Sequence, residues 1–367
     1  MTLANKYIIF TSMSILDFFR KFKKKPEVPQ PDQQPQQPVH IEERFILCID
    51  GGGMRGIIPA TMLMQLEQSL RKNGGNKDIA SYFDYIAGTS TGGLITLALT
   101  CEPNLKHEEV ENGTQISLKA LLNNYMTMGE IIFPSTHLNS IRKFVRNRYP
   151  SKPIEDLVKQ WFGNKTLGEA KYPTVLIAYD LSEGKTKLLR SYADESQYPV
   201  WVAARATSAA PTYFAPIEYQ QEVLVDGGVV ANNPVIYAYY EAKKMYPNCS
   251  KFHILSLSTG GTYHTINADE TSNGFLGWAE QIVPMYSTAQ RRTSDYVINN
   301  IADVEYLRLD EPLPETIGLD ETNMVILKKM HSHAKVLAEK NLDKIEDYAI
   351  KLIKNMEYKD ASQAGRV

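Results

Sequence analysis

The sequence predicts an α/β protein in which helices cover both faces of a mostly parallel sheet. Short, almost entirely apolar runs recur along the chain, as expected for strands that are buried on both faces. They lie at residues 45–49, 82–87, 174–178, 223–225 and 253–257. Apolar residues at helical spacing occupy stretches between and after these runs, at residues 57–70, 94–99, 202–210, 234–244 and 337–356. Alternation of strands with helices is typical of a parallel sheet with crossover helices.

Composition excludes several classes of protein. The chain has 367 residues and 43% hydrophobic content, which is enough for one large domain or two small ones. A net charge of -2 gives no general attraction to nucleic acid, so we expect no nucleic acid polymer as partner. The three cysteines, Cys48, Cys101 and Cys249, are far apart and form no C-x-x-C pair. This spacing argues against a disulfide framework and against a structural zinc site.

Residues 1–40 differ in composition from the rest of the chain. In residues 1–25, five apolar side chains between Ile15 and Phe22 lie at helical spacing, and five basic residues fall between Arg20 and Lys25. This composition fits a basic amphipathic segment lying on an anionic membrane, and it also fits a disordered tail. Residues 26–40 are rich in proline and glutamine and are expected to form an extended linker. The folded domain is therefore predicted at residues 41–357, with a tail at 358–367.

The N-terminal segment bears on localisation. No run reaches the roughly 18 apolar residues that a membrane-spanning helix requires. Residues 7–16 are moderately apolar and follow Lys6, as in a signal peptide, but Asp17 interrupts them and no small-residue cleavage site follows. We therefore expect a cytoplasmic protein rather than a secreted one, and residues 1–25 are the candidate segment for any peripheral membrane contact.

The first chemical motif is Gly88-Thr89-Ser90-Thr91-Gly92, a G-x-S-x-G sequence between a predicted strand and a predicted helix. In a nucleophile elbow, the serine sits on a strained turn and the flanking glycines make room for it. The helix that follows directs its N-terminal amides toward the reacting centre. The pattern alone also fits a turn that needs glycine only for its backbone shape.

The second motif, Asp50-Gly51-Gly52-Gly53-Met54-Arg55-Gly56, follows the first predicted strand and opens the first helix. A glycine loop in this position turns backbone amides toward one point, where they can bind an oxyanion. Arg55 adds positive charge that could also hold a phosphate headgroup. The glycines satisfy G-x-G-x-x-G, but a dinucleotide site needs an acidic residue at the end of the next strand. That strand ends instead at Ser90.

The third motif, Asp226-Gly227-Gly228, follows the apolar run at 223–225. Its carboxylate could accept the Ser90 proton directly, provided that shielding from water raises the pKa above the usual value of about 3.9. A triad would need a histidine later in the chain. His253, His264, His331 and His333 all follow Asp226, and none lies in a recognisable turn motif. Arg205 and Asn232 are expected to have packing and turn roles.

The three motifs, in this order, resemble the patatin-like phospholipase family. Two further stretches resemble segments of that family: residues 206–214, and residues 255–260, where Ser258 replaces a more usual glycine. The resemblance implies a three-layer α/β/α sandwich and a Ser-Asp dyad that cleaves fatty acyl esters of phospholipids and galactolipids without a metal or other cofactor. It implies that Ser90 is the nucleophile and Asp226 its base. It also implies that the amides of Gly51, Gly52 and Gly53 line the oxyanion hole, that Arg55 supports this loop, and that Gly88 and Gly92 flank the elbow.

Two other functions stay open at this point. An acyltransferase would use the same dyad and pass the acyl group to an alcohol rather than to water. A silent lipid-binding or regulatory protein would keep the fold without turnover. Some bacterial members of the family respond to a small-molecule activator, but no residue pattern here indicates such a site.

Overall fold

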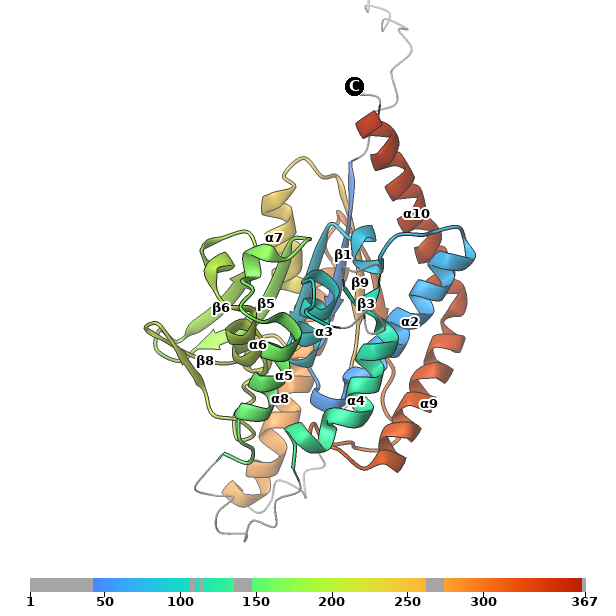
Figure 1. Ribbon diagram of the computed structural model, residues 1–367. Coiled ribbons are helices and arrows are strands. Elements are labelled where there is room, and N and C mark those ends of the chain that lie inside the picture. The colour runs from blue at the N-terminus through green and yellow to red at the C-terminus, as the bar shows by residue number, and fades with distance from the viewer. Residues whose placement is uncertain (1–41, 106–109, 112–114, 135–146, 262–273, 365–367) are drawn as a thin grey trace, which may run out of the picture. The chain divides into compact units, whose positions relative to one another are not determined.

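A computed structural model describes residues 42–105, 110–111, 115–134, 147–261 and 274–364 (Figure 1). The segments predicted at 1–25 and 26–40 lie outside the described residues, as does His264. By their internal contacts, residues 41–367 form one compact unit. The site described below lies entirely within this unit.

The centre of the domain is an eight-stranded sheet that is mostly parallel, as predicted. Its first five strands pair in parallel, and the remaining three pair antiparallel at the β5 edge. The order is β10 (Val304–Leu309), β9 (Lys251–Leu257), β1 (Glu43–Ile49), β2 (Tyr85–Thr89), β5 (Thr174–Asp180), β8 (Glu222–Asp226) and β7 (Ile217–Tyr219), with β6 (Lys185–Arg190) also on β5. A separate ribbon pairs β3 (Val110–Glu111) with β4 (Gln115–Ile116).

Helices cover both faces of the sheet, which confirms the α/β/α sandwich (Figure 1). One face packs α2 (Ile57–Lys72), α3 (Thr91–Thr100), α4 (Leu118–Ile132), α5 (Lys152–Phe162), α6 (Val200–Ser208), α9 (Met324–Lys340) and α10 (Leu342–Ala364). The other packs α7 (Val235–Met245) and α8 (Gly274–Asn299). None of the helices in the described part of the chain is long and apolar enough to cross a bilayer.

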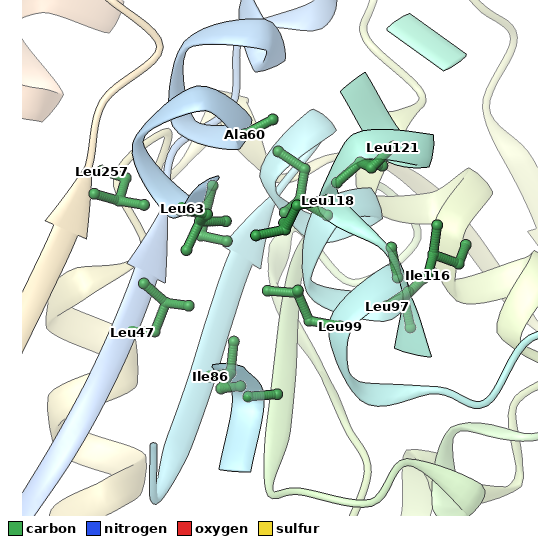
Figure 2. Packing of buried hydrophobic residues seen from close by; sticks show 14 of the residues in the cluster. Leu47, Ala60, Leu63, Ile86, Leu97, Leu99, Ile116, Leu118, Leu121 and Leu257 are labelled. Atoms are coloured by element: carbon green, nitrogen blue, oxygen red, sulfur yellow. The ribbon is translucent and has the colours of Figure 1, made fainter. Parts of the chain in front are cut away.

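Successive side chains of a strand point to opposite faces of the sheet, so one apolar run contributes to the hydrophobic cores on both faces. In β1, Leu47 and Ile49 pack toward α2, whereas Ile46 and Cys48 pack toward α7. Figure 2 shows the first of these cores, where side chains from β1, β2 and β9 meet those of α2, α3 and α4. The sheet is therefore buried on both faces, as the apolar runs predicted.

The structure differs from the sequence prediction at several element ends. Residues 79–82 form a 3-10 turn, and β2 begins only at Tyr85. Helix α6 ends at Ser208, so residues 209–210 are not helical. Helix α10 continues to Ala364, beyond the predicted boundary at residue 357. Two ion pairs join this extension to the rest of the domain, because Lys359 contacts Asp84 at 2.6 Å and Asp360 contacts Lys77 at 2.7 Å.

All three cysteines are buried free thiols. Burial raises the pKa of Cys101 to about 12, and it also raises the pKa values of Cys48 and Cys249. The thiolate is the reactive form of cysteine, so these side chains contribute packing rather than chemistry.

Candidate functional site

Two strands end against the same edge of β5, and this junction brings Ser90 and Asp226 together. Strand β2 runs parallel to β5, and its last residue, Thr89, lies opposite Ile177. Strand β8 runs antiparallel, and its last residue, Asp226, lies opposite Ala178, the next position of β5. The carboxyl ends of β2 and β8 therefore meet beside β5. Ser90 follows Thr89 directly, so the pairing register alone places it beside Asp226.

Ser90 occupies the strained turn that the G-x-S-x-G motif predicted. Its backbone has φ 55° and ψ -124°, in a region that residues with a side chain rarely adopt. The neighbouring chain leaves no space at Gly92, where an added Cβ would lie 2.2 Å from the Ile49 carbonyl oxygen. Thr207 fixes the turn from α6, because its Oγ1 accepts the Ser90 amide at 2.9 Å and donates to the Ile177 carbonyl at 2.6 Å.

Asp226 is a buried carboxylate at the end of β8, and it interacts with the Gly228 amide and the Ser90 side chain. Its Oδ1 accepts the Gly228 amide at 2.7 Å, and the Ser90 side chain lies near enough to its carboxylate to lower the pKa of Asp226. Burial raises the pKa of Asp226 to about 6, although the Ser90 side chain and the Gly228 amide both oppose the shift. A carboxylate with this pKa is a better base at neutral pH than an exposed aspartate.

The glycine loop after β1 is held against Ser90 by its neighbours. The Gly51 carbonyl accepts Thr259 Oγ1 at 2.6 Å and Asn232 Nδ2 at 3.0 Å, and the Gly51 amide donates to the Asn232 carbonyl at 3.0 Å. An added Cβ at Gly51 would lie 3.1 Å from Ser90 Cβ and 2.5 Å from Asn232 Oδ1. Asn232 thus clamps the loop, a larger role than the turn role expected from sequence. Because the Gly51 amide already donates to the Asn232 carbonyl, it is not free to donate to an oxyanion as the sequence predicted.

The next two amides of the loop remain available. Met54 donates to the Leu319 carbonyl at 2.8 Å, whereas the Gly52 and Gly53 amides have no hydrogen-bond acceptor within the described residues. Gly53 has φ 58°, which turns the chain into the short helix η1 (Gly53–Gly56). Arg55 Nε donates to the Gly52 carbonyl at 3.3 Å, so it supports the loop from behind. Burial lowers the pKa of Arg55 to about 10, and its charge is retained at neutral pH.

An ion pair anchors the start of the loop. Asp50 is fully buried, and its carboxylate accepts Arg308 Nη1 at 2.8 Å and Nη2 at 2.5 Å. Burial raises the pKa of Asp50, while Arg308 opposes this shift. Arg308 lies on β10, 258 residues away in sequence, so no local motif could reveal it.

An apolar pocket opens beside Ser90 and extends between α4 and α5. Each helix contributes one stripe of side chains at spacings of three and four residues. Trp161 lies at the end remote from Ser90, because its carbonyl accepts the amide of Asn104, just beyond the far end of α3. The lining residues are Gly53, Met54, Ser90, Thr91, Leu94, Leu121, Asn124, Tyr125, Met128, Gly129, Ile132, Phe133, Ile154, Leu157, Val158, Trp161, Ser208, Ala210, Tyr213, Phe214 and Leu319.

The described histidines lie away from this junction. His253 pairs with Phe45 across β1 and β9, four residues before Ile49, which corresponds to roughly 13 Å along the strand. Its ring stacks on Phe45 and bonds Glu43 at 2.8 Å. His331 and His333 lie on α9, which packs against α2. Arg205 has the packing role expected of it, since it joins α6 to Glu155 and Ser151 of the α5 region.

Comparison with known proteins agrees with the resemblance that the motifs predicted. The sequence model of the patatin-like phospholipase family matches residues 47–239. Patatin-like protein 2 of Arabidopsis thaliana is 30% identical over 331 residues, covering 78% of this chain and 80% of the relative. Patatin-like protein 1 of Oryza sativa subsp. indica is 32% identical over 330 residues, covering 77% of each chain. Patatin-16 of Solanum tuberosum is 30% identical over 326 residues, covering 78% and 82%.

Among solved structures, that of VipD from Legionella pneumophila aligns with 82% of this chain and 67% of its own, at a TM-score of 0.38 and 12% identity. This likeness is too distant to bear on function. The family match, by contrast, spans more than half of the sequence. The chain therefore belongs to the patatin-like phospholipase family.

Proposed function

We propose that this protein is a lipid acyl hydrolase of the phospholipase A type, which cleaves fatty acyl esters of membrane glycerolipids through a Ser90–Asp226 dyad. The observation that carries the proposal is the strand register that brings Ser90 beside Asp226, a buried carboxylate whose pKa is about 6, next to an apolar pocket. The pocket suits a fatty acyl chain, because its lining is almost entirely apolar. Family membership supports lipid acyl hydrolysis in general.

In the first half of the reaction, Ser90 Oγ attacks the acyl carbonyl carbon and its proton passes to Asp226. The carbonyl oxygen becomes an oxyanion, which the Gly52 and Gly53 amides stabilise. Removing one such donor typically costs about 2.7 to 4 kcal/mol of transition-state stabilisation. The ester C–O bond then breaks, and Asp226 returns the proton to the departing alcohol of the lysolipid. Ser90 is left carrying the acyl group.

In the second half, water attacks the acyl-enzyme and gives its proton to Asp226. Collapse of the second tetrahedral intermediate releases the fatty acid, and the proton returns to Ser90 Oγ. Both halves use one base and one oxyanion site, so no histidine is required. An apolar surrounding favours this arrangement, because it keeps the pKa of the carboxyl near the working pH.

The experiment that tests the proposal measures fatty acid released from mixed phospholipid vesicles by mass spectrometry. We compare the wild type with Ser90→Ala and Asp226→Asn, and with the control variants Ser182→Ala and Asp156→Asn at exposed positions. We expect release by the wild type and both controls and none by the two dyad variants. Release that survives Asp226→Asn would contradict the dyad, and the histidines would then be tested. An added alcohol acceptor separates hydrolysis from acyl transfer in the same assay.

A further inference from the structure

Helix α8 runs alongside the sheet and then continues past the edge that carries the candidate active site. Near the end of the helix, Asp295 accepts the Tyr306 hydroxyl of β10 at 2.6 Å. Five residues earlier, Gln290 donates to the carbonyl of Val229 at 2.9 Å, and Val229 lies just after the Asp226 motif. The helix has therefore reached the level of the site at Gln290. Residues 274–285 extend about 18 Å further at 1.5 Å per residue (Figure 1).

This first part of α8 presents apolar side chains to solvent. Trp278 is 42% exposed and Ile282 is 51% exposed, and Met285 is exposed as well. Spacings of four and three residues place these three side chains on one face of the helix. Residues 274–290 contain a single charged residue, Glu280. The outer face of a surface helix normally carries charged and polar residues, so this face is suited to an apolar neighbour.

Two other elements bring exposed apolar side chains to the same end of the domain (Figure 1). Ile131 is exposed in the last turn of α4, next to Ile132, which lines the apolar pocket. Met324 and Val325 are exposed in the first turn of α9. This turn follows Leu319, which also lines the pocket and whose carbonyl accepts an amide of the glycine loop at 2.8 Å. The exposed side chains of α4 and α9 therefore lie close to the mouth of the pocket.

The apolar rim is the name used below for six exposed side chains: Ile131, Trp278, Ile282, Met285, Met324 and Val325. They lie at the end of the domain where a lipid has to enter the pocket. A protein bound to this end would cover the entrance, whereas a bilayer bound there would supply the acyl chain. Tryptophan and large apolar side chains on one face of a helix are also typical of segments that lie in the interface of a bilayer.

We propose that the apolar rim inserts into the interfacial region of a lipid bilayer, with α8 as the main inserting element, and that this contact seats the pocket mouth on the membrane. The choice of a bilayer rests on the proposed function, in which the pocket takes up an acyl chain. The rim side chains are uncharged, so they bind neutral and anionic bilayers alike and keep their affinity at high salt. In this they differ from residues 1–25, whose predicted membrane contact depends on charge.

Trp278 provides the first test, because its fluorescence reports its own surroundings. The chain has three tryptophans, of which Trp161 is buried and Trp201 is half-buried. We compare full-length Ser90→Ala, which cannot consume the lipid, with the same protein carrying Trp278→Phe. Neutral phosphatidylcholine vesicles at high salt exclude a contribution from the basic segment. We expect a blue shift, and quenching by lipids with brominated acyl chains, that Trp278→Phe loses. Emission without either change overturns the proposal.

Vesicle sedimentation provides the second test. Each apolar side chain taken out of water contributes enough for Trp278→Ser and Ile282→Ser each to weaken binding to neutral vesicles roughly tenfold. Tyr296→Ser is the matched control, since Tyr296 is on the same helix and is 72% exposed but lies beside Asp295, at the level of the sheet. We expect this control to bind as the wild type does. Turnover of vesicle lipid should fall with binding, while turnover of a soluble ester is kept.

These measurements separate the rim from the proposed function. If the wild type hydrolyses no lipid, the proposed function fails, while fluorescence and sedimentation still test the rim without turnover. Binding that is unchanged in both rim variants, or equally weakened in Tyr296→Ser, overturns the proposal. Analytical ultracentrifugation tests a second copy of the chain as the occupant. A wild-type dimer that Trp278→Ser converts to a monomer, with vesicle binding unchanged, would assign this face to self-association and also overturn the proposal.

Discussion

At the scale of single residues, the proposed chemistry depends on one carboxyl group that is kept from water. The pKa of Asp226 is about 6, mainly because of burial. Only the deprotonated form can accept the Ser90 proton, so activity should be lost when this group is protonated. We predict that kcat/KM falls about tenfold for each pH unit below pH 6 and levels off above it. A pH profile measured with a soluble ester tests this, and activity that persists unchanged at pH 4.5 would contradict it.

The same burial has a consequence for stability. A group whose pKa rises on folding stabilises the folded state below its unfolded pKa, and this contribution is lost as the pH rises through the folded pKa. Asp226 shifts from 3.8 to about 6, so its burial should cost on the order of 2 to 3 kcal/mol above pH 7. We predict that Asp226→Asn raises the free energy of unfolding by this amount at pH 8 and by little at pH 3.5. Urea denaturation at both values tests it, with Asp156→Asn as the exposed control.

Residues that carry local motifs could be predicted from sequence, and residues that only support them could not. Ser90 stands between Gly88 and Gly92 after an apolar run, and Asp226 follows an apolar run and precedes Gly227, so both signals are local. Arg308 reaches Asp50 from 258 residues away, and Thr207 reaches Ser90 from 117 residues away. Such partners depend on the register of the sheet, which apolar periodicity does not specify.

At the scale of elements, strands buried on both faces were predictable and edge strands were not. The runs at β1, β5, β8 and β9 are continuous and apolar, and the structure confirms each as a strand. Strand β6 is partly exposed and carries lysine and arginine, so it lacks the signal of a central strand. The antiparallel direction of β8 was also not predictable, since direction depends on the path of the connecting chain.

Helices α4 and α5 line the apolar pocket, and they predict which acyl chain lengths the protein prefers. Trp161 lines the remote end of the apolar pocket and is 7% exposed. Replacing it with alanine should lengthen the pocket and move the preference toward longer acyl chains. Each methylene that gains contact is worth about 0.8 kcal/mol, or roughly fourfold in kcat/KM. Turnover of esters of increasing chain length tests this. Phe162→Leu is the matched control, because it also reduces core packing but lies outside the pocket lining, and an identical profile in both variants would contradict the prediction.

At the scale of the whole molecule, the alternation of strands and helices was sufficient to predict an α/β/α sandwich. Apolar strands need helices on both faces of the sheet to bury their side chains. The apolar strands and their alternation with helices along the sequence together therefore predict the three layers. The same reasoning does not extend to residues 26–40, because a segment rich in proline and glutamine has too little apolar surface to build a core. Residues 1–25, by contrast, carry a cluster of positive charge.

This positive charge predicts a membrane contact that the full chain makes and a truncated chain lacks. Five basic residues between Arg20 and Lys25 follow a cluster of phenylalanines, and each basic residue near an anionic surface is worth about 1 kcal/mol. We predict that deleting residues 1–40 weakens binding to anionic vesicles by at least about tenfold while the turnover of a soluble ester is kept, because Ser90 and Asp226 lie in the unit at 41–367. Vesicle sedimentation measures the binding. Replacing only the five basic residues with alanine separates charge from chain length, and it should reproduce most of the loss at low salt. If the deleted chain binds anionic and neutral vesicles as the full chain does, the segment has no membrane role, and the lipid contact must then come from the domain that carries the pocket.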